Sequence, residues 1–240
     1  MINVLLPCMG NSVFFKDSYF PKLMTEVGGM TMLERVVDGY ASLAHHRMIF
    51  IMGREECTRF HIDDSAKLLC GETGKVIRLA AQTKGALCTC LMAVEEIDND
   101  DPLIIANSDQ VLDEDMNGIL ASFASREADA GLVTFRNVHP RWSYARVEGD
   151  EVTEVAEKRP ISPHAIAGLY YYRHGRDFIR AAKSAIKKEA TVDGIYYISA
   201  TINELILSGA KVCHCEVDPE SYHSFYTPEK IKEYEKGEKV

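Results

Sequence analysis

Short apolar runs alternate with longer mixed stretches along the first 110 residues. Four runs are typical of buried strands, and they cover 2–6, 47–52, 76–79 and 103–106. Three stretches compatible with helices separate them, at 32–44, 55–69 and 87–96. Thr31 and Glu34 have the spacing of a capping box at the start of the first helix. The alternation predicts a right-handed, mostly parallel sheet flanked by helices.

The pattern changes after about residue 115. Further strands are predicted at 130–135, 152–156, 165–172 and 211–217. Further helices are predicted at 115–128, 177–188, 196–207 and from Pro228 onward. Residues 148–151 read Glu-Gly-Asp-Glu, which favours a hairpin turn. A chain of 240 residues fits one large α/β domain, or a domain with a small subdomain.

The predicted strand at 103–106 runs directly into four polar residues. These are Asn107, Ser108, Asp109 and Gln110. Ligands of open α/β sheets bind at the carboxyl ends of the strands. A carboxylate there, close to amide side chains, suits a hard cation such as Mg²⁺ that also carries phosphate oxygens. A strand followed by an Asx turn would account for the same four residues without a ligand.

The loop after the first strand contains one glycine and small polar residues. It reads Gly10, Asn11 and Ser12, a composition that lets backbone approach phosphates or a base. One glycine is neither a dinucleotide fingerprint nor a P-loop. Lys22 follows Pro21 and precedes a short apolar segment, from which it could reach back as a phosphate clamp. A solvated surface lysine is the simpler interpretation of Lys22 alone.

Composition and charge narrow the class of protein. The chain is 46% hydrophobic and 26% charged, with a net charge of −9. That charge argues against a nucleic-acid binder that depends on phosphate neutralisation. No apolar run approaches the length of a membrane span, and the first strand begins at Ile2, so we expect a cytoplasmic protein without a membrane partner. The seven cysteines, which include Cys213 and Cys215, are expected to be reduced and mostly buried rather than bound to zinc.

Several motifs occur in an order that resembles one known family. They are the glycine loop, Pro21-Lys22, Gly28-Gly29 before Met32-Leu33-Glu34-Arg35, the 82–85 loop, the strand before Asp109, Glu157-Lys158, and Gly168 to Tyr172. The chain resembles the sugar-1-phosphate nucleotidyltransferases, and most of all the small bacterial members associated with capsule and surface-polysaccharide biosynthesis. The resemblance implies a Rossmann-like, GT-A type, three-layer α/β/α fold with a mixed, mostly parallel central sheet.

The resemblance also implies a reaction and a division of the single domain, 1–240. The family condenses an NTP with a phosphorylated acceptor, usually a sugar 1-phosphate, and releases diphosphate. Residues 1–115 would form the nucleotide-binding half and 116–228 the acceptor-binding half, with 229–240 as a charged tail. The NTP would be CTP, UTP or dTTP, because a glutamine amide at position 82 can pair with any of these bases.

Individual roles follow from the same resemblance. Lys22 would hold the triphosphate and stabilise charge at the α-phosphorus, and Asp109 would coordinate Mg²⁺. The remaining nucleotide-binding residues would be Gly10, Asn11, Ser12, Gln82, Gly85, Asn107 and Ser108. The acceptor would be bound by Glu157 through its hydroxyls, by Lys158 through its phosphate, and by Gly168 and Trp142 as parts of the pocket wall. A tryptophan packed in the core is an equally good interpretation of Trp142.

The chain departs from the family pattern at two places. The family loop reads Gly-x-Gly-x-Arg, whereas residues 10–15 contain no arginine. Lys16 could stand in, although a point charge does not replace a bidentate fork. Ser224 stands where many relatives have a second metal-binding aspartate, and Asp193 or Asp218 would be the substitutes.

Other functions fit the same residues. One is a cytidylyltransferase that uses CTP and a non-sugar phosphate, such as phosphocholine or a phosphorylated amino-acid amide. Another is a GT-A glycosyltransferase in which Ser108, Asp109 and Gln110 hold a metal and a nucleoside diphosphate. A third is a catalytically inactive nucleotide-binding relative. A homo-oligomer is compatible with each of them.

Overall fold

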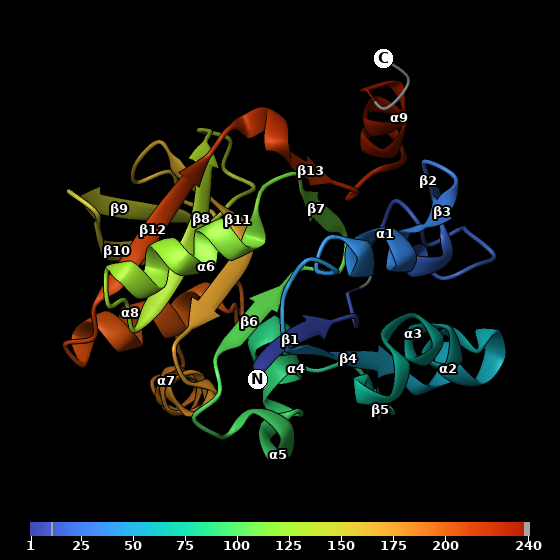
Figure 1. Ribbon diagram of the computed structural model, residues 1–240, viewed down its shortest axis with the longest axis horizontal. Coiled ribbons are helices and arrows are strands. Elements are labelled where there is room, and N and C mark those ends of the chain that lie inside the picture. Colours follow the sequence, from blue (N-terminus) through green and yellow to red (C-terminus); the bar gives the residue numbers. More distant parts are fainter. Residues whose placement is uncertain (11, 238–240) are drawn as a thin grey trace.

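The computed structural model describes residues 1–10 and 12–237 (Figure 1). Its central sheet contains nine strands from this described part of the chain. They are β1 (Ile2–Pro7), β4 (His46–Gly53), β5 (Lys75–Leu79), β6 (Leu103–Ala106), β8 (Ala130–Arg136), β9 (Tyr144–Glu148), β10 (Glu151–Ala156), β11 (His164–Tyr172) and β12 (Val212–Val217). Their order across the sheet is β5-β4-β1-β6-β11-β8-β12-β10-β9, so one sheet runs through both predicted halves.

The sheet is mixed, as predicted, but it is parallel mainly in its N-terminal half. β5, β4, β1 and β6 are parallel neighbours. Beyond β6, β11 runs antiparallel to both β6 and β8, and β10 runs antiparallel to β9 and β12. Only β8 and β12 are parallel in that half. The prediction of a mostly parallel central sheet is therefore wrong: it holds for the N-terminal half, whereas after residue 115 β9 and β10 form a hairpin and β11 runs antiparallel to both of its neighbours.

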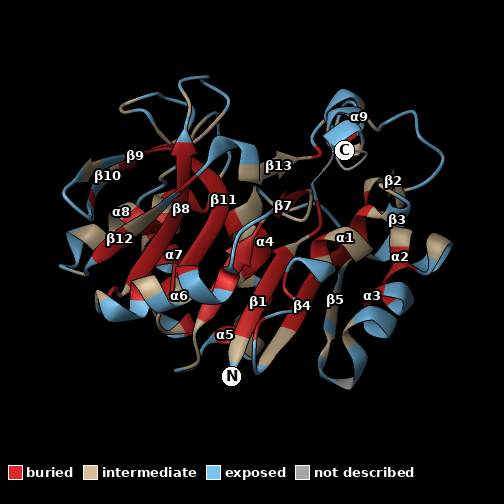
Figure 2. Cartoon of the chain, turned by 45° about the horizontal axis from the view of Figure 1, so that its top comes forward, coloured by how far each residue is buried: buried red, intermediate tan, exposed pale blue. Residues whose placement is uncertain are grey.

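Helices cover both faces of the sheet, because alternate strand residues point to opposite sides. One core contains Val4 and Ile104 together with α1 (Met32–Asp38), α3 (Ile62–Cys70) and α6 (Met116–Ser125). The other contains Leu5 and Ile105 together with α4 (Ala86–Leu91), α7 (Gly175–Lys187) and α8 (Ser199–Leu207). Figure 2 shows the buried residues concentrated in the strands between these helices.

Several predicted helices are shorter or divided. The predicted 55–69 helix is two helices, α2 (Arg54–Phe60) and α3, separated at His61, whose φ of 55° is left-handed. The predicted 87–96 helix is divided into α4 and α5 (Val94–Ile97). The 32–44 helix ends at Asp38, after which hydrogen bonds such as that from the Tyr40 amide to the Val37 carbonyl form turns. Its start is confirmed: Thr31 and Glu34 form the capping box.

Four short strands form two small sheets outside the central sheet, and one of these joins segments that lie far apart in the sequence. β2 (Glu26–Val27) and β3 (Met30–Thr31) form a hairpin around the predicted Gly28-Gly29 turn. β7 (Gln110–Leu112) pairs with β13 (Tyr222–Ser224), a pairing that the sequence analysis missed. The charged helix predicted from Pro228 is α9 (Pro228–Gly237), which lies beside β2 and β13 (Figure 1). The C-terminal segment therefore returns to the N-terminal half of the molecule.

The helices and the cysteines bear on two properties of the chain as a whole. Among the described residues, no helix combines the length and the apolar character needed to cross a membrane. All seven cysteines have free thiols, and four of them are buried, as expected.

Candidate active site

Lys22 and Asp109 form an ion pair at the carboxyl end of β6. Asp109 lies in the turn between β6 and β7, and Lys22 opens the short 3₁₀ helix Lys22–Met24. The Lys22 Nζ atom pairs with Asp109 Oδ2 across 87 residues of sequence. Only 14% and 25% of the two side chains are exposed, so the pair is shielded from solvent screening. The two residues expected to be catalytic are thus brought together.

The C-terminal segment covers this ion pair. The Phe225 amide donates to the Asp109 carbonyl oxygen at 2.8 Å, and Ser224 lies opposite Gln110 in the β7–β13 pairing. The Lys22 ammonium lies 5.6 Å from the centroid of the Tyr226 ring and 5.4 Å from that of Phe15. These contacts hold the ammonium against two aromatic faces, a favourable arrangement for a cation.

Gly168 of β11 fits tightly against the residues that follow β6. The Gly168 carbonyl accepts a hydrogen bond from the backbone N–H of Asn107 at 3.0 Å. The side-chain nitrogen of Asn107, Nδ2, donates to Gln110 Oε1 at 3.0 Å. Gln110 Nε2 in turn donates to the Ala167 carbonyl at 2.6 Å. A Cβ atom on Gly168 would lie 2.1 Å from Asn107 Nδ2, and the glycine has a φ of +62°. Only glycine fits there without strain.

The neighbouring Ser108 contacts Cys8, the residue that follows the first strand. A hydrogen bond with the Ser108 side chain offsets part of the effect of burial, which raises the pKa of the Cys8 thiol to about 12. The loop that follows contributes Gly10, at which an added Cβ would meet no atom within 4 Å. Asn11 lies outside the described residues. Gly10 and Ser12 line a hollow of about 480 Å³ together with Lys16, Tyr19, Lys22 and Arg59.

The 82–85 loop is anchored to the segment that precedes α8. Gly85 has a φ of +127°, and a Cβ there would lie 2.3 Å from the Tyr196 carbonyl oxygen. The Tyr196 amide donates to the Lys84 carbonyl at 2.8 Å. Gln82 is exposed at the surface of this loop. The close approach at Gly85 places the predicted base-binding loop against Tyr196, the residue before Tyr197.

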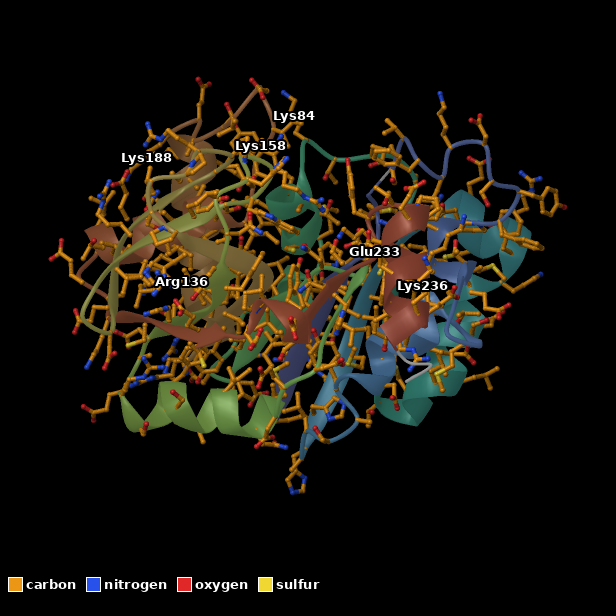
Figure 3. All side chains as sticks on the ribbon, turned by 90° about the horizontal axis from the view of Figure 1, so that it is seen from above. Lys84, Arg136, Lys158, Lys188, Glu233 and Lys236 are labelled. Atoms are coloured by element: carbon orange, nitrogen blue, oxygen red, sulfur yellow. The ribbon has the colours of Figure 1, made fainter. Side chains whose placement is uncertain are left out.

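Glu157 and Lys158 lie on the same side of the molecule as this loop. The Glu157 carboxylate accepts hydrogen bonds from the Ser143 and Ser199 hydroxyls. Lys158 has a left-handed φ of 53°, and its Nζ atom donates to the Tyr197 hydroxyl at 2.6 Å. That hydrogen bond, together with the nearby Glu157 carboxylate, raises the pKa of Lys158, which therefore stays charged at neutral pH. Figure 3 shows Lys84 and Lys158 at one edge of the molecule.

The sequence analysis missed the three partners of this pair. Ser143 directly follows Trp142, which was itself a candidate pocket residue, whereas Ser199 and Tyr197 carry no local signal. They reach Glu157 and Lys158 only because α8 packs beside β10. A hydrogen-bonded carboxylate next to a fixed ammonium can bind a ligand that has both hydroxyl and phosphate groups.

Trp142 packs edge-on against two aromatic residues and is half-buried. The ring centroids of Phe135 and Tyr222 lie 5.3 and 5.5 Å from that of Trp142. The Tyr222 hydroxyl donates to Gln110 Oε1 at 3.1 Å, so this aromatic group is connected to the residues after β6. The indole thus packs against the core, and the Arg141 guanidinium lies over it at 4.3 Å.

The carboxylates near the site decide how it could hold a magnesium ion. Among the described residues, no group of three His, Cys, Asp or Glu side chains is placed to hold a metal. Asp218 caps a 3₁₀ helix by accepting from the Glu220 amide, and Asp193 lies near Lys158. Asp109 is therefore the candidate carboxylate at this site. Mg²⁺ is commonly held by one or two carboxylates plus substrate phosphates, which this arrangement fits.

Comparison with known proteins supplies a fold. No family model and no curated protein matches the sequence. The structure is similar to the nucleoside-diphosphate-sugar pyrophosphorylase from Vibrio cholerae, with a TM-score of 0.82 and 23% identity over 98% of this chain and 100% of that one. It is also similar to a Bacillus anthracis protein assigned as a glucose-1-phosphate thymidylyltransferase. The TM-score is 0.78 and the identity 16%, over 98% of this chain and 94% of that one. A third neighbour is the UDP-glucose pyrophosphorylase from Acinetobacter baumannii. Its TM-score is 0.74 and its identity 13%, over 98% of this chain and 92% of that one.

These likenesses define a class of fold. The chain shares the mixed α/β fold of these nucleotidyltransferase structures over nearly its whole length. At 13 to 23% identity, these similarities establish the fold alone. The reaction therefore has to be inferred from the site residues of this chain.

Proposed function

We propose that the chain is a nucleotidyltransferase that transfers a nucleoside monophosphate from an NTP to a phosphorylated small acceptor. The Lys22–Asp109 ion pair at the carboxyl end of β6 carries this proposal. Glu157 and Lys158 support it, because they offer a carboxylate and a charged amine on the acceptor-binding half of the chain. The names of the structural neighbours, two pyrophosphorylases and a thymidylyltransferase, point to the same reaction.

The proposed reaction needs positioning and charge stabilisation more than covalent chemistry. An oxygen of the acceptor phosphate attacks the α-phosphorus, the bond to the β-phosphate oxygen breaks, and diphosphate leaves. The acceptor phosphate is already ionised, so the site needs no general base. Alignment and electrostatic stabilisation supply most of the rate of such transfers.

The ion pair suggests how the site would respond to substrate. In the structure, Lys22 and Asp109 neutralise each other. When an NTP binds, Lys22 would turn to the phosphate oxygens, and Asp109 would be free to hold Mg²⁺. Bound Mg²⁺ would neutralise part of the phosphate charge. The exchange keeps a shielded carboxylate paired with a cation in both states, which avoids the cost of an uncompensated charge.

More than one acceptor and more than one base fit the proposed reaction. A sugar 1-phosphate is the first choice, and the product would then be an activated precursor for capsule or surface polysaccharide. CTP with a non-sugar phosphate, such as phosphocholine, is the second. The exposed Gln82 amide would recognise the base, since it can both donate and accept hydrogen bonds.

A catalytically inactive nucleotide-binding relative is the second candidate function. Two observations favour it. Residues 10–15 lack the loop arginine, and Ser224 lies beside Gln110 where a second metal-binding carboxylate is expected. A hydroxyl there is a weaker ligand for a hard divalent cation than a carboxylate.

Diphosphate release separates these candidates. The experiment crosses CTP, UTP, dTTP, ATP and GTP with sugar 1-phosphates, phosphocholine and phosphorylated amino-acid amides in the presence of Mg²⁺. Turnover of one pair would establish the reaction, the base and the acceptor together. Binding of an NTP without release across the whole panel would support the inactive relative. Release of a nucleoside diphosphate from a nucleotide sugar would instead identify a glycosyltransferase.

A further inference from the structure

Arg141 presents an unpaired guanidinium at the candidate active site. Its Cζ atom lies 4.3 Å from the Trp142 ring centroid and 5.3 Å from that of Tyr226. Within the described part of the chain, no carboxylate forms an ion pair with it and no side-chain hydrogen bond uses its N–H groups. The nearby Arg146, by contrast, pairs with Glu154 at 3.0 Å. Stacking holds the Arg141 guanidinium in place while its N–H groups stay available.

The position of Arg141 relates it to the Lys22–Asp109 ion pair. The Tyr226 ring that contacts Arg141 also contacts the Lys22 ammonium, at 5.6 Å. Electrostatics agree: burial and the Asp109 carboxylate raise the pKa of Tyr222, and Arg141 lowers it, so this phenol lies within reach of both charges. Arg141 thus comes from the second half of the chain but lies beside residues of the first.

Tyr226 also contacts the position at which the family pattern has its loop arginine. Counting Gly-x-Gly-x-Arg from Gly10 puts the arginine at position 14, where this chain has Phe14. The Phe14 ring contacts the Tyr226 ring edge-on, with centroids 5.3 Å apart. Phe14 in the glycine loop and Arg141 in the second half of the chain therefore both contact the Tyr226 ring. A guanidinium on either segment would reach the same neighbourhood.

We propose that Arg141 binds the phosphate oxygens of the NTP and of the departing diphosphate, in place of an arginine in the glycine loop. This inference rests on the proposed nucleotidyltransferase function, and it makes Arg141 a phosphate-binding residue of that site. A guanidinium offers two parallel N–H groups to a phosphate, which the ammonium of Lys16 or Lys22 does not. The chain would then bind triphosphate with one lysine from the first half and one arginine from the second.

The experiment compares Arg141→Ala and Arg141→Lys with Arg146→Ala as a matched control. Arg146 is also exposed and lies on the neighbouring β9, but it is already paired with Glu154. Calorimetry measures the affinity of each variant for Mg²⁺-NTP and for diphosphate, and steady-state kinetics measures KM for both substrates. We expect Arg141→Ala to weaken NTP and diphosphate binding about 10- to 100-fold, and Arg141→Lys to recover only part of the loss.

Further measurements show which ligand Arg141 serves. The acceptor KM should stay within about twofold of wild type, and thermal unfolding should show that Arg141→Ala is folded. Recovery of NTP affinity in a Phe14→Arg, Arg141→Ala double variant would place both arginines on the same phosphates. Equal NTP and diphosphate affinities in Arg141→Ala and Arg146→Ala would overturn the inference, as would a rise in the acceptor KM alone.

The binding measurements do not depend on turnover, so the two proposals fail separately. If no substrate pair reacts but Arg141→Ala still weakens NTP and diphosphate binding, the reaction is refuted and the phosphate-binding role of Arg141 stands. If a pair reacts at wild-type NTP affinity in Arg141→Ala, the reaction stands and the role of Arg141 is refuted. If the wild-type chain binds neither NTP nor diphosphate, both are refuted.

Discussion

Replacing Gly168 with alanine should uncouple the residues after β6 from β11. The new Cβ atom would lie 2.1 Å from Asn107 Nδ2 and 2.7 Å from Gln110 Oε1. Both atoms are ends of side chains, so they can move aside. Moving them breaks the hydrogen bonds from Asn107 to Gln110 and from Gln110 to the Ala167 carbonyl. The substitution therefore converts a steric conflict into unsatisfied polar groups in a largely buried place.

The expected magnitude has two parts. Holding alanine at the φ of +62° costs about 1 kcal/mol. Leaving a buried donor or acceptor without its partner costs about 1–3 kcal/mol more. We expect Gly168→Ala to lower the free energy of unfolding by about 2–4 kcal/mol. Gly149 is a matched control: its φ is +61°, and a Cβ there would meet no atom within 4 Å. Gly149→Ala should therefore cost only about 1 kcal/mol.

Urea unfolding of both variants at unchanged m-value measures this difference. Adding Asn107→Ala to Gly168→Ala removes the closest clash, so the two substitutions should cost less together than the sum of each alone. Diphosphate release should fall in Gly168→Ala and persist in Gly149→Ala. If the two glycine variants lose the same stability, the close packing at Gly168 is not what requires glycine there, and the reasoning is refuted.

Three further predictions concern the site and the first helix. Asp109→Asn should reduce diphosphate release at least about 100-fold with an unchanged circular dichroism spectrum, and near-normal turnover would remove Asp109 from the metal site. Lys158→Ala should raise the acceptor KM about tenfold with little change in the NTP KM; Lys188→Ala is its control, and equal effects on both substrates would contradict the assignment. Hydrogen bonds from Thr31 lower the pKa of Glu34, so Glu34→Gln should be less stable than wild type at pH 7. That difference should disappear in urea unfolding as the pH falls below 4.5 through the lowered pKa, and a difference that persists at pH 2 would contradict the electrostatic origin.

The sequence identifies candidate site residues that follow recognisable motifs. Asp109 belongs to the polar group that ends an apolar run, and Lys22 follows a proline after a glycine loop, so each has a local pattern. The structure then brings them together. Ser199 and Tyr226 have no such pattern, because they reach the site only through contacts made by the complete fold. Periodicity describes which face of an element is apolar, and it says little about which distant polar side chain will meet that face.

The errors in the predicted fold have similar causes. Strand directions after residue 115 depend on how β11 inserts between β6 and β8, which apolar runs alone do not reveal. β7 and β13 have three residues each, too few for a strand pattern to be recognised. The helix break at His61 needs a left-handed backbone at a residue that is not glycine, so composition gave no warning. In each case tertiary contacts outweigh local preference.

The pairing of β13 with β7 has a consequence for how the protein matures during synthesis. Phe225 donates its amide proton to the carbonyl oxygen of Asp109, and Tyr226 contacts Lys22. At about 5–20 residues per second, a ribosome needs roughly 10 s to add the stretch between Asp109 and Phe225. During that interval the parallel strands of the first half can already collapse, but the edge that carries Asp109 stays open. A nascent chain would therefore gain the sheet of its first half well before the candidate active site is complete.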